Sequence, residues 1–199
     1  MMKVAICGGI GSGKSTICRM FAERGVPHYD SDARAKALMN ESEELREALI
    51  AAFGAECYAD GVLNRPYLAS QVFGSAEHLA RLNAIVHPVV KADFLSWADE
   101  QEGEYCILES AILFESGFDV LVDKTVAVLA PMPLRVERAM QRDGASREQI
   151  EARVKAQMSD DELMARCDFS IVNFNLEDVE KDVAELHFRF KTMSNEQTR

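Results

Sequence analysis

The chain has 199 residues, of which 48% are hydrophobic and 28% charged, a composition typical of one soluble globular domain. Its formal net charge of −11, from 33 acidic against 22 basic residues, argues against a nucleic-acid binder, which would present a basic face. No apolar run approaches the ~20 residues of a transmembrane helix, and the N-terminus shows no signal-peptide pattern. We therefore expect a cytoplasmic protein with neither a membrane nor a nucleic acid as partner.

The cysteines are Cys7, Cys18, Cys57, Cys106 and Cys167, an odd number without any C-x-x-C pair. This pattern favours reduced thiols over a disulfide framework or a zinc site. Cys7 and Cys106 fall in predicted core strands, where they are interpreted as small hydrophobic residues.

An apolar strand predicted at residues 4–7 leads into Gly8-Gly9-Ile10-Gly11-Ser12-Gly13-Lys14-Ser15, which matches the pattern G-x-x-x-x-G-K-[ST] of a phosphate-binding loop. The glycines let successive backbone N–H groups cradle phosphate oxygens. Lys14 is placed for the β and γ phosphates of a nucleotide, and the Ser15 hydroxyl is the usual Mg²⁺ ligand. A glycine-rich turn without function is the alternative, disfavoured because strand, loop and helix follow in the required order. The predicted nucleotide-binding residues here are Gly9, Gly11, Ser12, Gly13, Lys14, Ser15 and Thr16.

Thr16 begins a predicted helix whose positive N-terminal end favours phosphate, and Gly25 stands where its C-cap belongs. A second strand at 26–29 ends at Asp30-Ser31-Asp32. Four helices are then predicted, at 33–53 with Gly54 as its stop, 66–73, 76–86 and 88–100, with a turn at Asp60-Gly61. This helical insertion, residues 31–100, is far longer than a usual connection between strand and helix, so we expect it to hold a second substrate.

A third strand at 105–108 carries Glu109 at its end, and Leu113-Phe114-Glu115 follows on a loop or short helix. A fourth strand is predicted at 125–129, Pro133 opens the next helix, and capping boxes at Ser146 and Ser159 start two more. A fifth strand at 169–172 precedes a closing helix at 176–193 and a tail, 194–199, that we expect to fray. The alternation predicts an α/β fold, a single domain (1–199) with a doubly wound parallel five-stranded sheet whose ligands lie at the C-terminal ends of its strands.

Asp30 and Asp32 follow the second strand. Either carboxylate could accept the proton of an attacking hydroxyl while the other holds Arg34 or a metal, and we favour Asp30 as the base because it is nearest the strand end. Capping of the following helix is an equally good interpretation of Asp32. Glu109 is expected to hold Mg²⁺ through water, with a helix-capping or loop acid as its alternative.

Arg138 and Arg142 are spaced i, i+4 and share one helical face. They are either a solvated surface or, as we favour beside a phosphate loop in an acidic protein, a clamp for phosphates. Gly144 would let the arginine-bearing segment 134–166 close as a lid. His87, before Pro88, is expected to pack or hydrogen-bond rather than catalyse.

With these residues in place, the chain resembles the dephospho-coenzyme A kinase family, from Lys3 to about Phe188. The resemblance rests on residues 8–16, on Asp30-Ser31-Asp32 with Arg34, on Leu82-Asn83 with His87-Pro88, on Leu113-Phe114-Glu115, on the lid residues Arg138, Arg142, Arg147, Arg153 and Gln157, and on Asp168, Ile171 and Asn173. Glu109 departs from the aspartate common there. Asn175 replaces an expected glycine, and because asparagine tolerates a left-handed backbone we expect it to do the glycine's work.

The resemblance implies transfer of the ATP γ-phosphoryl group to the 3′-hydroxyl of the ribose of dephospho-coenzyme A, with Mg²⁺ as cofactor. On this basis Asp30 orients the hydroxyl, and Lys14 with the lid arginines Arg138 and Arg142 holds phosphates. Asn173 lies near the adenine of ATP, and Ser15 and Glu109 serve the metal. The implied acceptor-binding residues are Asp32, Arg34, His87, Leu113 and Glu115.

Two other functions stay open. One is another small P-loop kinase that phosphorylates a nucleoside, nucleotide or sugar. The other is a nucleotide-binding switch without turnover, which the Asp30/Asp32 pair disfavours because a switch needs no acceptor base. We expect only small-molecule substrates and a monomer or weak homo-oligomer.

Overall fold

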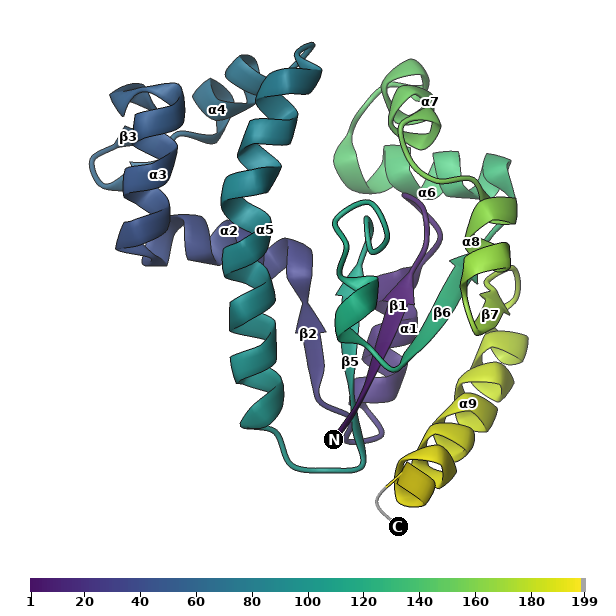
Figure 1. The fold of residues 1–199 in the computed structure, drawn as a ribbon. Coiled ribbons are helices and arrows are strands. Elements are labelled where there is room, and N and C mark those ends of the chain that lie inside the picture. The colour runs from purple at the N-terminus through teal and green to yellow at the C-terminus, as the bar shows by residue number, and fades with distance from the viewer. Residues whose placement is uncertain (198–199) are drawn as a thin grey trace. The chain divides into compact units, whose positions relative to one another are not determined.

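A five-stranded parallel sheet in the order β2-β5-β1-β6-β7 organises the computed structural model, which describes residues 1–197 (Figure 1). Its strands are β1 (Met2–Cys7), β2 (His28–Asp30), β5 (Tyr105–Ser110), β6 (Lys124–Leu129) and β7 (Phe169–Val172). β1 pairs with β5 along its whole length, so that Cys7 lies opposite Ser110, and Asp30 of β2 lies opposite Glu109. The predicted sheet is thereby confirmed.

Helices pack on this sheet in one compact unit formed by residues 1–30 and 98–199. They are α1 (Lys14–Ala22), α6 (Met132–Asp143), α7 (Arg147–Lys155), α8 (Asp160–Arg166) and α9 (Leu176–Gln197), with a 3-10 turn at Asp119–Leu121. α1 and α9 contribute Phe21, Val183 and Phe190 to a core cluster that includes Ile107 and Val128 of the sheet. Burial of each such side chain stabilises the fold by about 1.5–3 kcal/mol.

Residues 31–97 form a second compact unit. Its elements are α2 (Ser31–Glu41), α3 (Glu43–Phe53), a 3-10 turn (Ala55–Cys57), β3 (Tyr58–Ala59), β4 (Val62–Leu63), α4 (Arg65–Val72) and α5, which runs from Ala76 to Asp99. The predicted turn at Asp60-Gly61 joins β3 to β4, with φ of 50° and 79° at the two residues. Positive φ at both central residues is the backbone of a tight hairpin.

Two helix boundaries in this unit were predicted wrongly. The single helix expected at 33–53 is divided, because Ser42 leaves the helical conformation and its side chain accepts the Leu45 N–H, which caps α3. The helix break expected at Pro88 is absent from the described chain, since α5 continues through it. Val86, Val90, Phe94 and Ala98 are all buried at a spacing of four. Their burial outweighs the ~3 kcal/mol that an internal proline costs.

The two ends of the main unit also differ from expectation. α1 begins at Lys14 rather than Thr16, so the loop feeds directly into the helix. α9 continues to Gln197 where fraying was predicted from 194, because the Ser194 hydroxyl donates to the Glu104 carbonyl and Lys191 pairs with the Glu104 carboxylate at 3.1 Å. Residues 198–199 of the predicted tail lie outside the described residues.

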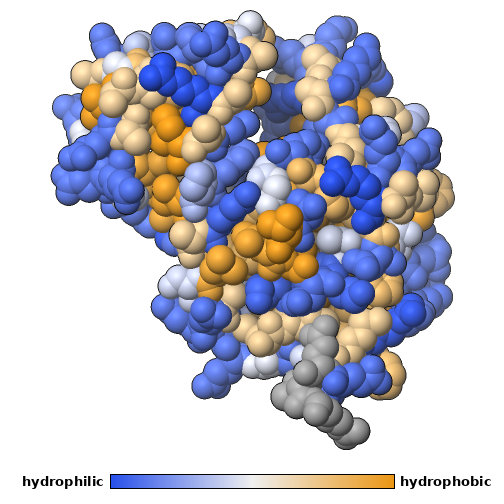
Figure 2. Space-filling model, in the orientation of Figure 1, coloured by the Kyte–Doolittle hydropathy of each residue, from blue (hydrophilic) through white to orange (hydrophobic). Residues whose placement is uncertain are grey.

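Hydrophilic side chains predominate on the face shown in Figure 2, in keeping with the net charge of −11. Within residues 1–197, no helix combines the length and apolar character needed to cross a bilayer.

Candidate active site

The glycine-rich loop between β1 and α1 adopts a backbone conformation that residues with a Cβ could not adopt at its glycine positions. Gly11 and Gly13 have φ of 74° and 92°, and a Cβ at Gly11 would overlap the backbone carbonyl of Arg135. Gly13 is the N-cap of α1, whose first turn carries Lys14, Ser15 and Thr16. The backbone N–H groups at a helix start form a binding site for anions.

Lys14 lies against the loop. Its ammonium donates to the Gly8 carbonyl at 2.7 Å and is 3.5 Å from the Gly9 carbonyl oxygen. The charge is therefore held beside the backbone amides that a phosphate would contact.

Glu109, near the C-terminal end of β5, is buried and hydrogen-bonded at both carboxylate oxygens. The Ser15 hydroxyl donates to Oε1 at 2.6 Å, and Nε2 of His28 lies 3.1 Å from Oε2. Burial favours the neutral acid, but the bonds to His28 and Ser15 outweigh it and lower the pKa of Glu109. The carboxylate is therefore ionised at neutral pH, next to the Ser15 hydroxyl.

This hydroxyl and carboxylate form the oxygen ligand set that Mg²⁺ prefers. A second set of possible metal ligands includes the same carboxylate. Cys18, His28 and Glu109 have ligand atoms within 4.8 Å of one another and form the cluster of His, Cys, Asp or Glu side chains, among residues 1–197, that could hold a metal ion. Burial raises the pKa of the Cys18 thiol well above its usual range, which disfavours the thiolate that binds soft metals. The residues present thus fit magnesium, through Ser15 and Glu109.

Asp30 is the last residue of β2 and lies opposite Glu109 in the register, at the same edge of the sheet as the loop. Three other predicted site residues belong to the unit of residues 31–97. Asp32 lies in the first turn of α2. Arg34 binds Asp93 through two nitrogens at 2.8 and 3.0 Å and Glu41 through a third at 3.1 Å. His87 lies in α5, and its pKa is lowered by burial and the charge of Lys91.

Arg138 and Arg142 lie on α6 with different partners. Nη1 of Arg138 donates to the Asn173 carbonyl at 3.3 Å. Arg142, with a side chain 63% exposed, pairs with Asp143 at 2.7 Å, and Arg153 contacts the same carboxylate at 2.9 Å. The pKa of Asp143 is lowered, mainly by its hydrogen bond to Arg142. Arg138 is therefore held toward β7, whereas Arg142 presents its guanidinium largely to solvent.

The sequence pattern did not assign a role to Arg135, yet it is the buried arginine of α6. Its Nε donates to the Ile10 carbonyl at 3.1 Å, and Nη1 contacts Asp160 at 2.7 Å. Gln157 accepts the Ile10 N–H at 2.8 Å, so both backbone groups of Ile10 are bonded to distant segments. The available signal was weak: Arg135 precedes Arg138 by three residues on the same helix.

Asn173 also contacts the loop, since its side-chain amide donates to the Ser12 carbonyl at 2.8 Å. A Cβ at Gly13 would overlap that amide, which explains the glycine. Asn175 does not adopt the left-handed backbone that was expected of it: within residues 1–197, Asp60 alone among residues other than glycine has a positive φ. The Asn175 side chain instead accepts the Glu177 N–H at 2.9 Å, at the start of α9.

Leu113 and Glu115 lie in the turns after β5. Leu113 is buried, whereas Glu115 is exposed and accepts the Met158 N–H at 3.4 Å.

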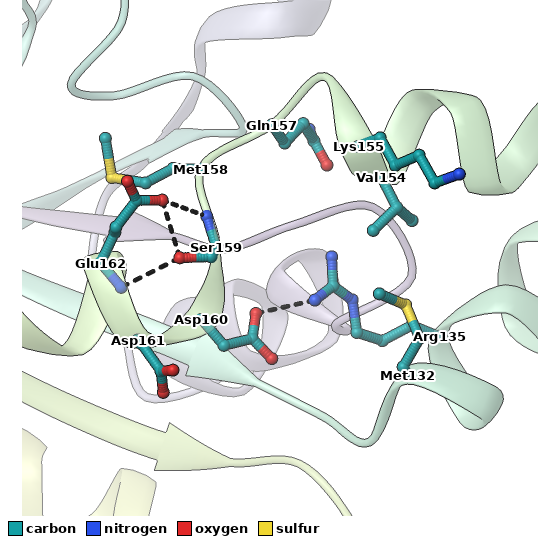
Figure 3. Close-up of a pocket in the computed structure, with 10 residues that line it drawn as sticks. All are labelled: Met132, Arg135, Val154, Lys155, Gln157, Met158, Ser159, Asp160, Asp161 and Glu162. Atoms are coloured by element: carbon teal, nitrogen blue, oxygen red, sulfur yellow. Dashed lines mark hydrogen bonds and ion pairs between the residues drawn. The ribbon is translucent and has the colours of Figure 1, made fainter.

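A pocket of about 510 Å³ adjoins the residues that brace the loop (Figure 3). In Figure 3 the Arg135 side chain extends toward Asp160, to which it is bonded, and the Ser159–Glu162 capping box lies on the opposite side of the pocket. Its lining residues are Met132, Arg135, Val154, Lys155, Gln157, Met158, Ser159, Asp160, Asp161 and Glu162.

Figure 1 shows α6 and α7 beyond the C-terminal ends of β1 and β6. The loop, Glu109 and Asp30 share this edge of the sheet, where ligands of parallel α/β folds bind. The arrangement provides a nest of amides, an ammonium, an oxygen pair for a divalent cation and a further carboxylate. These are the parts needed to position and transfer a phosphoryl group.

Comparison with known proteins agrees with this chemistry. The profile of a family described as dephospho-CoA kinase matches residues 2–178. A dephospho-CoA kinase of Porphyromonas gingivalis is 44% identical over 174 residues, covering 87% of this chain and 86% of that protein. A solved structure from Thermus thermophilus superposes with a TM-score of 0.80 at 36% identity, over 94% of this chain and 97% of the other. A dephospho-CoA kinase from Campylobacter jejuni, at 24% identity, shares the fold with a TM-score of 0.69, over 96% and 97% of the two chains.

Proposed function

This chain belongs to the dephospho-CoA kinase family and is a kinase of the last step of coenzyme A synthesis, and we propose that its reaction moves the γ-phosphoryl group of ATP to the 3′-hydroxyl of dephospho-coenzyme A. The observation that carries the proposal is the shared edge of the sheet. There the glycine-rich loop, the Ser15–Glu109 pair and Asp30 come together.

In this proposal the loop binds the triphosphate. The backbone N–H groups of Gly11, Gly13 and Ser15 contact its oxygens, and Lys14 leaves the Gly8 carbonyl to contact the β and γ phosphates. Arg142 is the lid arginine that can reach a phosphate without losing a buried partner, because its bond to Asp143 is solvent-exposed. Asn173 holds the loop from the side of β7, near which the adenine of ATP would lie, and Arg138 bonds the Asn173 carbonyl.

Ser15 and Glu109 are the residues that would hold Mg²⁺, Ser15 directly and Glu109 through water. When bound, the ion neutralises charge on the transferred phosphoryl group. The low pKa of Glu109 keeps the carboxylate charged for this purpose.

Asp30 is the proposed base. Its carboxylate accepts the proton of the ribose 3′-hydroxyl as the oxygen attacks the γ-phosphorus. The bond between that phosphorus and the β,γ-bridging oxygen breaks, and ADP leaves. Asp32, in the first turn of α2, is the alternative base and otherwise orients the acceptor.

The helical insertion, residues 31–100, is proposed to bind the acceptor through Asp32, Arg34 and His87, with Leu113 and Glu115 contributing from the turns after β5. Arg34 already has three nitrogens bonded to carboxylates. It can engage an anionic acceptor by exchanging Glu41, whose side chain is 59% exposed, while Asp93 continues to hold it.

Residues 134–166 are proposed to close over the nucleotide as a lid. Gly144, with φ of 64°, ends α6 at a position where the chain direction can change at low cost. We also propose that the protein works in the cytoplasm, on small molecules, as a monomer or weak homo-oligomer.

The test is an acceptor panel. The protein with ATP and Mg²⁺ is offered dephospho-coenzyme A, a nucleoside, a nucleoside monophosphate and a sugar, and ADP release is measured for each. We expect turnover with dephospho-coenzyme A and its conversion to coenzyme A. Turnover confined to another acceptor would support a different small P-loop kinase, and nucleotide binding without acceptor-dependent ADP release would indicate a switch.

A further inference from the structure

Two cysteines distant in sequence meet at the root of the phosphate-binding loop. Cys7 is the last residue of β1, and Cys167 lies between α8 and β7. Their Sγ atoms are 3.5 Å apart. Cys7 is 1% exposed, whereas Cys167 is partly exposed.

The sheet holds both thiols in place. Cys7 ends β1 in parallel pairing, opposite Ser110 of β5 and Ala127 of β6. The backbone of Cys167 is fixed on either side: its N–H bonds the Leu163 carbonyl at 2.9 Å, and the N–H of Asp168 bonds Thr125 Oγ1 at 3.0 Å. The contact between the sulfurs is thus part of the packed fold.

The two thiols differ in reactivity. The hydrogen bond to Cys167, together with burial, raises the pKa of Cys7, and the same bond lowers the pKa of Cys167. Lys14 and Glu115 contribute opposing charges near Cys7, as Arg166 and Asp168 do near Cys167. Cys167 is therefore both the more accessible sulfur and the better nucleophile, with Cys7 in reach as a partner.

We propose that Cys7 and Cys167 form an oxidative modification site, at which a peroxide converts the thiol pair to a disulfide. The Cys167 thiolate attacks a peroxide oxygen, which breaks the O–O bond of hydrogen peroxide and leaves a sulfenic acid and hydroxide. The Cys7 sulfur then attacks the Cys167 sulfur. The S–S bond forms, the S–O bond breaks, and the Cys7 proton leaves with the hydroxyl group as water.

The disulfide would act on the loop. An S–S bond is about 2.05 Å long, so the sulfurs must approach by roughly 1.5 Å. Cys7 precedes Gly8, whose carbonyl accepts the Lys14 ammonium at 2.7 Å. We expect this displacement at the base of the loop to weaken nucleotide binding several-fold, a consequence that rests on the loop being the nucleotide site.

The other cysteines supply a control. Cys18, Cys57 and Cys106 are buried, and burial raises the pKa of each thiol. Cys57 lies in the unit of residues 31–97, so Cys57→Ser removes a buried thiol from the unit that contains neither Cys7 nor Cys167.

The experiment oxidises the reduced full-length protein with hydrogen peroxide and counts free thiols after denaturation. We expect two of the five thiols to disappear, the intact mass to fall by two hydrogens, and dithiothreitol to restore both. Peptide mapping without reductant should link the segments containing Cys7 and Cys167. Cys57→Ser should form the same link, and Cys167→Ser should not.

Retention of all five thiols by the wild type would overturn the proposal. So would oxygen addition to Cys167 without a cross-link, a link between two chains, or disulfide formation in Cys167→Ser. Binding of a fluorescent ADP analogue is measured beside the thiol count. If the disulfide forms while the affinity for the ADP analogue stays unchanged, the proposed effect of the disulfide on the loop is wrong. Neither the thiol count nor the binding measurement depends on phosphoryl transfer, so these results are independent of whether the proposed kinase reaction is correct.

Discussion

Replacement of Arg135 by methionine should both destabilise the protein and weaken nucleotide binding. The Arg135 side chain is 4% exposed and makes a bond to the Ile10 carbonyl and an ion pair with Asp160. A hydrogen bond to a charged group is worth about 1.5–3 kcal/mol. Asp160 is 35% exposed, so its pair is discounted toward the ~1 kcal/mol of a surface salt bridge. The sum is about 3 kcal/mol, since methionine preserves most of the buried stem.

For a protein of this size, about 3 kcal/mol corresponds to a fall in Tm of roughly 6–12 °C. Thermal unfolding followed by circular dichroism measures it, and titration with ADP measures binding. Arg147→Met is the matched control, because Arg147 is an exposed arginine with a single i, i+4 partner, Glu151, at 3.5 Å. Its Tm should barely change.

A double-mutant cycle with Asp160→Asn separates the two contacts of Arg135. The ion pair should account for the smaller part of the loss, and the bond to Ile10 for the larger part and for the loss of ADP affinity. Wild-type Tm and ADP affinity in Arg135→Met would refute the inference that this side chain braces the loop.

Three further changes test the proposed chemistry. Asp30→Asn should lower kcat at least ~100-fold with ADP affinity unchanged, and steady-state kinetics with normal turnover would exclude Asp30 as the base. Lys14→Ala should impair both nucleotide affinity and kcat, so near-normal kinetics would contradict the assignment of the loop. Glu109→Gln tests a pH dependence: the folded pKa of Glu109 lies below its ordinary value of 4.5, so its ionised form stabilises the fold above that pH, and the contribution is lost as pH falls through the folded value. Urea unfolding should show a stability gap between wild type and variant that narrows below pH 4.5, whereas a gap independent of pH would contradict it.

Features written in consecutive residues were predictable from the sequence. The capping boxes at Ser146 and Ser159 start α7 and α8 as expected, because both partners of each box lie within four residues. The strand, glycine loop and helix at the N-terminus are likewise local. Even here α1 begins two residues early, since Gly13 rather than Lys14 or Ser15 is the last non-helical residue.

Features that depend on tertiary contacts were not predictable. The passage of α5 through Pro88 needed knowledge of what its apolar face buries. The helix break at Ser42 is different: its bond to the Leu45 N–H is local, and it was missed because Ser42 can equally continue a helix. Arg135 and Asn173 contact the loop across 125 and 161 residues of sequence, and their spacing alone says nothing of those bonds. The sequence pattern favoured Arg138 and Arg142. Of these two, Arg142 proves largely exposed, and the buried arginine of the same helix, Arg135, was not assigned a role.

The bond from the Ile10 N–H to Gln157 has a practical consequence. Gln157 belongs to the proposed lid, residues 134–166, whereas Ile10 belongs to the phosphate-binding loop, which does not move with it. The amide proton of Ile10 is therefore exposed to solvent whenever the lid and the loop separate. The rate at which this proton exchanges with deuterium therefore reports how often the lid opens. NMR or mass spectrometry can measure that rate without a fluorescent label and without any turnover of substrate.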